Sequence, residues 1–141
     1  MPASRWVPCA LLLIGFGCQQ DPPAEAPGTA PPAALVQQNW QKAAAVVQGK
    51  LLAVQDGKNT FSSAQIVVQK VYKGPFQAGD TIRYYSFRGE RYDSALVGRP
   101  RVVFLASRRE DDGRTTWGTA TDLAEFPYSL ALEKLLRSTQ P

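Results

Sequence analysis

Beyond residue 45 the hydrophobic positions fall into short runs rich in β-branched and aromatic residues, separated by turn residues. The turn signals combine Gly with Asp, Asn or Pro and lie at residues 56–59, 73–75, 79–80 and 110–113. The runs between them predict five strands, over residues 46–55, 63–72, 81–87, 101–107 and 115–121. Gly49 lies inside the first run, where a glycine is typical of a bulge or bend.

Two segments that flank the strands have helical features. Residues 35–45 predict a short helix with Trp40 packed on the body of the domain. After Pro127 interrupts the last β-like run, Ser129 is suited to cap a helix over residues 130–137, whose leucines form one apolar face. We expect this last helix to cover the core and not to lie on a membrane.

Five short strands joined by turns and closed by a helix predict a mainly β fold. The number of elements fits a small, five-stranded, OB-like antiparallel barrel with a C-terminal helix. Closing the sheet into a barrel would also remove exposed strand edges. Hydrophobic periodicity alone does not separate this barrel from a small sandwich.

The start of the chain has the pattern of a secretory signal. Arg5 and the amino terminus supply positive charge, and residues 7–17 are apolar apart from Pro8. This stretch of about 11 residues is too short to span a bilayer, which needs about 20. No later stretch is long enough, so we expect no transmembrane helix.

Residues 14–18 end in Gly17 and Cys18, and this small residue before a cysteine resembles the lipobox of bacterial lipoproteins. Gly15 and Phe16 depart from that pattern, which usually has a leucine-like and a small residue there. The resemblance implies that residues 1–17 are removed and that acyl chains on Cys18 anchor the protein in the lipid bilayer. It also implies a cell-envelope location, with the outer membrane favoured because aspartate does not follow Cys18. The alternative is an ordinary signal peptide with an incidental cysteine.

A proline-rich tether follows the cysteine. Residues 18–34 contain five prolines interleaved with alanine, which favours an extended spacer with little to bury. The predicted organisation is therefore a signal peptide over residues 1–17, a lipidated tether over 18–34 and a β-barrel domain over 35–141.

The composition is that of a globular protein and excludes several kinds of chemistry. Apolar residues make up 44% of the chain and charged residues 20%. Because histidine is absent, a Ser-His-Asp triad, a Cys-His dyad and an imidazole metal site are excluded. The only two cysteines are Cys9, in the predicted leader, and Cys18, so the domain has no disulfide and no thiol nucleophile. We expect no enzyme activity, no cofactor and no metal.

Several sequence segments of the domain resemble the netrin-like domains, the group that includes the tissue inhibitors of metalloproteinases. They lie at residues 44–54, 68–74, 78–82, 101–105 and 112–118, and their order carries the resemblance. It implies an OB-like barrel. Those inhibitors chelate the zinc of their target with the amine and carbonyl of an N-terminal cysteine, whereas here we expect Cys18 to be acylated and separated from the barrel by the tether. The family's disulfides are also missing, so we expect the fold to carry over but not the inhibitory mechanism.

Arginines and aromatic residues are interleaved over residues 83–101. The candidate patch for an anionic ligand or a partner protein comprises Arg83, Tyr85, Arg88 and Arg91. A surface of this type can hold single-stranded nucleic acid, but export to the envelope makes that partner unexpected. The alternative is simple alternation along strands, with aromatic residues inward and arginines in solvent. The oligomeric state is left open.

Three functions remain after these observations. We favour a non-enzymatic binding module that presents its barrel to an envelope protein or an anionic ligand. The first alternative is inhibition of a protease through barrel loops, with residues 89–98 as the candidate loop. The second is a carboxylate-based hydrolase using Glu90 and Asp93. Residues 110–113 lack the ligand spacing of a calcium loop and predict a charged hairpin tip.

Overall fold

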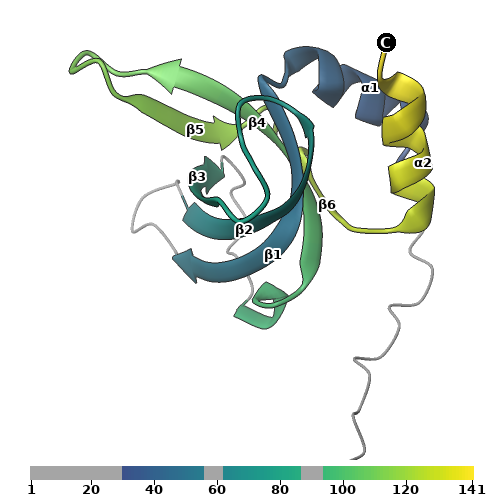
Figure 1. Cartoon of the computed structure of the whole chain (residues 1–141), viewed down its shortest axis with the longest axis horizontal. Helices are drawn as coiled ribbons and strands as arrows, with labels where there is room; N and C mark the ends of the chain where they lie inside the picture. Colours follow the sequence, from purple (N-terminus) through teal and green to yellow (C-terminus); the bar gives the residue numbers. More distant parts are fainter. Residues whose placement is uncertain (1–29, 56–61, 87–93) are drawn as a thin grey trace, which may run out of the picture.

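The computed structural model describes residues 30–55, 62–86 and 94–141 of the chain. These residues form two helices, six strands and one short 3₁₀ helix (Figure 1). In chain order they are α1 (Ala33–Lys42), β1 (Ala45–Gln55), β2 (Ser62–Lys73), β3 (Thr81–Ser86), η1 (Ser94–Leu96), β4 (Pro100–Arg109), β5 (Thr115–Thr119), β6 (Glu125–Pro127) and α2 (Leu130–Thr139). The five long β runs and both helices predicted from the sequence are present. Neither helix is long and apolar enough to cross a bilayer.

The strands close into a five-stranded barrel. Their order is β1-β2-β3-β5-β4, and β4 pairs with β1 again, which confirms the OB-like barrel and removes the sandwich alternative. The β3–β5 contact is a single parallel pairing between Tyr85 and Gly118, so the barrel is mixed and not wholly antiparallel. The short strand β6 pairs with residues 101–103, in the first half of β4. Strand β6 was not predicted, because it has only three residues and ends at Pro127.

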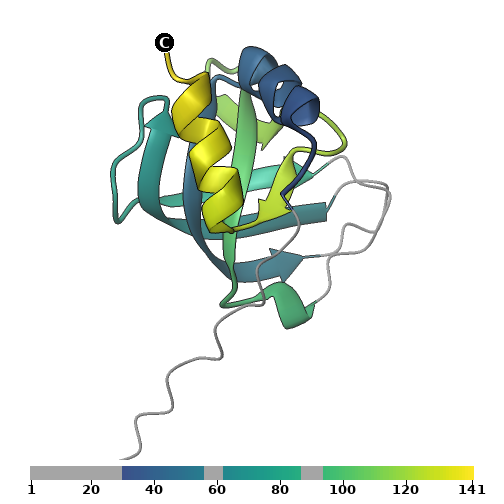
Figure 2. The same ribbon diagram turned by 90° about the vertical axis from the view of Figure 1, so that its right-hand side faces the viewer.

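Two hydrophobic layers pack on opposite faces of β1 and β4. Val47, Val103 and Leu105 point into the barrel. Val46, Val102 and Phe104 point outward and are covered by α1, α2 and β6. Because both faces of β4 are buried, its central residues form a continuous apolar run, as expected for a strand between two layers. Figure 2 shows both helices lying over the same side of the barrel.

Gly49 allows β1 and β2 to pack closely. The pairing of the two strands shifts register between Gln48 and Gly49, which confirms the predicted bulge. A Cβ atom on Gly49 would lie 2.0 Å from the carbonyl oxygen of Val67. No side chain fits into that distance, so glycine is required here for steric reasons.

Helix α2 is capped and docked as the sequence predicts. The Ser129 hydroxyl accepts a hydrogen bond from the Leu132 N–H at 3.1 Å. Leu132 and Leu136 are fully buried, and Leu135 packs against the same outer layer. The helix therefore closes the outer layer of the barrel.

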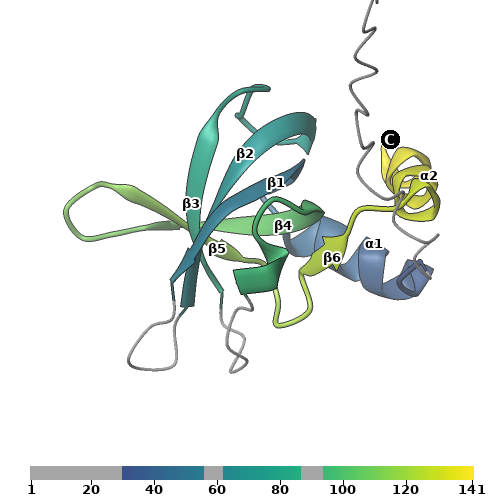
Figure 3. The ribbon, with the colours of Figure 1, turned by 90° about the horizontal axis from the view of Figure 1, so that it is seen from below.

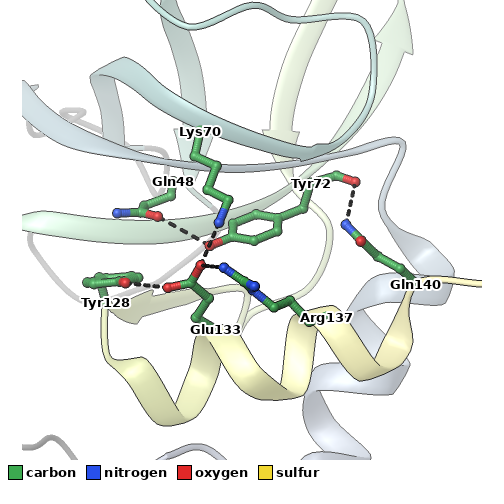
Figure 4. A network of polar contacts seen from close by, with 7 residues as sticks. All are labelled: Gln48, Lys70, Tyr72, Tyr128, Glu133, Arg137 and Gln140. Atoms are coloured by element: carbon green, nitrogen blue, oxygen red, sulfur yellow. Dashed lines mark hydrogen bonds and ion pairs between the residues drawn. The ribbon is translucent and has the colours of Figure 1, made fainter.

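A polar network also holds α2 against β2 (Figure 4). The Glu133 carboxylate accepts hydrogen bonds from Lys70 Nζ at 2.5 Å, Tyr128 Oη at 2.5 Å and Arg137 at 2.9 Å. These three donors, the Lys70 ammonium first, lower the pKa of Glu133 to about 2. Burial, followed by the nearby Glu133 charge, raises the pKa of Tyr72 to about 12. The network fixes α2 on the barrel, and we assign it a structural role.

Candidate functional site

A hairpin formed by β4 and β5 projects from the barrel on the side away from the helices, as Figures 1 and 3 show. At its base lies a groove of about 470 Å³. The groove extends from β4 across β5 to β3 and is lined by Tyr85, Ala106, Ser107, Arg108, Glu110, Thr116, Trp117, Gly118 and Thr119.

The groove is hollow because small residues form part of its floor. Gly118 pairs with Ala106 on β4 and with Tyr85 on β3, so these three residues share one face of the sheet. The next pair on that face is Thr116 with Arg108. The Tyr85 ring and the Arg108 side chain therefore rise on either side of a floor that has almost no side-chain volume.

Trp117 fixes the base of the hairpin. Its ring packs edge-on against Phe76, with ring centroids 4.8 Å apart, and both residues join the barrel core. The projecting strands are thus held by an aromatic contact at the point where they leave the barrel.

Arg83 and Tyr85 form a ridge beside the groove. Both point outward from β3, and the Arg83 guanidinium lies 5.9 Å from the centroid of the Tyr85 ring. Arg83 donates a hydrogen bond to Gln55 Oε1 at 3.4 Å and borders a second, smaller hollow of about 90 Å³ over β1 and β2. Tyr85 is 40% exposed. This pair from the sequence-predicted patch therefore separates two depressions on one exposed face.

The alternation of strand faces explains only part of the arginine and aromatic pattern. Tyr84 points into the barrel and donates a hydrogen bond to the buried Glu125 carboxylate, while its neighbour Arg83 is exposed, as alternation requires. Tyr85, however, is an outward aromatic residue, and Arg101 is an inward arginine that is only 5% exposed. The buried Arg101 Nε has no hydrogen-bond partner within the described ranges.

The other candidate residues lie outside the described residues. They are Cys18, Arg88, Arg91, Glu90 and Asp93. The structure therefore brings Arg83 and Tyr85 of the predicted patch together, and the remaining residues of the patch stay predictions.

Sequence reasoning missed the role of the β4–β5 hairpin in the site. It identified the charged tip, where Gly113 adopts a φ of 81° and its N–H donates to the Glu110 carbonyl. It did not identify Ala106 and Gly118 as a shared floor, since this requires the register of β4 with β5. The available signal was that Ala106 and Gly118 are both small and lie at similar distances in the sequence from the hairpin tip.

Charges on the hairpin are partly satisfied within it. Asp112 accepts hydrogen bonds from Arg114, which lower the pKa of that carboxyl. Arg108 lies 3.9 Å from Glu110 and is largely exposed. Among the residues with described positions, no carboxylate lies within ion-pair distance of Arg83. Arg83 is therefore the cation of this face that is best placed to receive an anion from outside.

The described residues contain no cluster of three or more side chains suited to holding a metal ion. Comparison with protein-family models gave no match, and no curated protein is significantly similar to the chain.

Proposed function

We propose that this chain is a lipid-anchored binding module of the bacterial cell envelope, without enzyme activity. One observation carries the proposal: the Arg83–Tyr85 ridge and the adjoining groove lie on an exposed face of the barrel, away from the helices that close the core. An aromatic ring, an arginine with no carboxylate partner among the described residues and a partly apolar hollow together suit a partner that brings both a negative charge and an apolar group.

The partner is an envelope protein or an anionic ligand. A guanidinium held near an aromatic ring is partly pre-organised, so it loses less freedom when it binds a carboxylate. The absence of histidine from the sequence and the confinement of its two cysteines to positions 9 and 18 support binding over covalent or acid–base catalysis.

The anchor in this proposal is Cys18, joined to the barrel by the proline-rich residues 18–34. Several acyl chains on one cysteine would hold the module permanently at a bilayer, where a single chain binds only reversibly. The tether then gives the barrel access to partners near the membrane, with the outer membrane as the favoured location.

A second candidate is inhibition of a protease through barrel loops. The projecting β4–β5 hairpin supports it, because a protruding loop can enter the active-site cleft of a protease. The N-terminal cysteine has no part in this alternative. Loss of protease activity on mixing with the protein would favour it over simple binding.

Photo-crosslinking in intact cells tests the binding module. A photoreactive phenylalanine analogue is placed at position 85 of the full chain and, as a control, at Leu130, which is 71% exposed on the helical side. We expect an adduct from position 85 that weakens when Arg83→Ala is added, and none of that mass from position 130. Equal labelling from both positions would contradict the proposal.

A further inference from the structure

The outer part of the β4–β5 hairpin has two open edges. β1 begins at Ala45, opposite Leu105, and the backbone of β3 pairs with β5 only at Gly118. In the described part of the chain, residues 106–109 and 115–116 therefore pair only with each other, whereas Trp117 adjoins the Tyr85–Gly118 pairing. Each strand of the hairpin presents an edge on which another strand could add.

The hydrogen bonds at the two ends of the hairpin show which backbone groups face these edges. The Glu110 N–H donates to the Arg114 carbonyl at 2.8 Å, and the Ala120 N–H donates to the Phe104 carbonyl at 2.9 Å. Because hydrogen-bonded and non-hydrogen-bonded pairs alternate in an antiparallel ladder, the backbone groups of Thr115 and Trp117 point away from β4. On the other strand, the same alternation turns those of Ser107 and Arg109 toward the opposite edge.

The two edges differ in chemistry. The β4 edge carries Arg108 and Arg109, and charged side chains of this kind discourage strand addition. The β5 edge reads Thr115-Thr116-Trp117, which is uncharged and has high β propensity. The groove bordered by Tyr85 lies at this second edge.

We propose that an extended peptide of a partner protein binds by adding as a strand to the open edge of β5. This inference rests on the proposed binding function and names the form of the partner. Backbone groups of the peptide pair with Thr115 and with the N–H of Trp117, and alternate side chains enter the groove. The main chain provides affinity, and the groove selects the side chains.

The groove selects an apolar side chain next to an acidic one. The floor of Ala106 and Gly118 leaves space for an apolar group. Arg108 lines one border beside its partner Glu110, and Arg83 lies behind Tyr85 at the other border, where it can receive an acidic side chain. Side chains two residues apart in a strand lie about 7 Å from each other on one face. A second copy of β5 is a poorer occupant, because residues 115–119 contain no acid to face either arginine.

A display library of random 12-residue peptides, selected on the immobilised full chain, tests this inference. We expect enriched peptides with an apolar residue and Asp or Glu at alternate positions. Binding of synthetic peptides is then measured by fluorescence polarisation. Thr115→Pro, which removes only an edge-facing N–H, should weaken binding by about tenfold or more. Arg109→Pro, which removes the equivalent group on the opposite edge, should leave binding within about twofold.

Chemically modified peptides provide a test on the unaltered protein. N-methylation of every second residue should abolish binding in one register and be tolerated in the other, because only alternate amides face β5. Equal tolerance in both registers, unchanged binding to Thr115→Pro, or no enriched peptide would overturn strand addition. Dimers that form with increasing concentration and disappear in Thr115→Pro would also overturn the binding of a partner peptide. They would show that a second copy of the chain occupies the edge. If position 85 still crosslinks a partner in cells, the binding function survives any of these results.

Discussion

The hydrogen atom that Gly49 carries in place of a side chain lets β1 and β2 approach closely. Its requirement for glycine is steric, since a Cβ would meet the Val67 carbonyl oxygen. Gly79 is different, because its φ of 97° favours glycine while the space around its Cα is open. Substitutions at these two positions therefore measure the cost of steric crowding and the cost of backbone strain separately.

We predict that Gly49→Ala lowers the free energy of unfolding by about 2 kcal/mol, because the added methyl group must displace backbone. Gly79→Ala should cost about 1 kcal/mol, through conformation alone. Urea unfolding followed by circular dichroism measures both. A Gly49→Ala protein as stable as the wild type would show that the strands are not in close contact there.

Glu133 makes the free energy of unfolding depend on pH in the acidic range. Its pKa in the folded protein is about 2, below the ordinary value of 4.5, so the unfolded chain takes up the proton first as pH falls. The stabilisation from this carboxylate is therefore complete above about pH 4.5 and is lost between pH 4.5 and 2.

Replacing Glu133 with glutamine should remove that part of the pH dependence. We expect Glu133→Gln to lower the free energy of unfolding at pH 7 by about 1–2 kcal/mol, with the gap to the wild type closing by pH 2. Glu110→Gln is the control, since its pair with Arg108 is long and exposed, and its effect should be under about 0.5 kcal/mol. A constant gap from pH 7 to pH 2 would show that the charge of Glu133 is not the cause.

Among the elements, α2 shows how one apolar stripe completes the fold. Leu136 is fully buried against the outer face of the barrel, whereas Leu130 in the first turn is exposed. Leu136→Ala should lower the free energy of unfolding by about 3 kcal/mol, and Leu130→Ala should change it by under about 0.5 kcal/mol. Similar losses in thermal or urea unfolding would mean that α2 does not dock through this face.

Element types were predictable where hydrophobic runs were long. Residues 46–55 and 101–107 lie within β1 and β4, and Ser129 caps α2, because these local signals agree with the final packing. Strand β6 was missed, since three residues ending in a proline show no periodicity. Its position depends on β4, which supplies the partner strand.

The whole molecule joins a barrel to a predicted membrane anchor. We predict that radiolabelled palmitate marks the wild-type protein in a bacterial host and that Cys18→Ser abolishes the label. The variant should also leave the membrane fraction. Cys9→Ser serves as the matched control, because Cys9 belongs to the predicted leader and its loss should leave the label unchanged. Labelling that survives Cys18→Ser would remove the lipoprotein assignment.

The candidate site was only partly foreseen at this scale. Arg83 and Tyr85 were identified from the mixture of arginine and aromatic residues on one strand. The groove beside them was not, because Tyr85 and Gly118 are far apart in the sequence and meet only through the parallel β3–β5 pairing. Arg101 belonged to the same sequence pattern but points into the barrel.

The sequence by itself determined the chemistry available to this protein and most of its elements. Histidine and cysteine content, the turn residues and the apolar runs all act locally, so they can be recognised without knowing the fold. Only the tertiary structure decided the parallel closure of the barrel, the face on which each arginine lies and the open edge of β5. These depend on strand register, and a shift of one residue would turn every side chain of a strand to the opposite face.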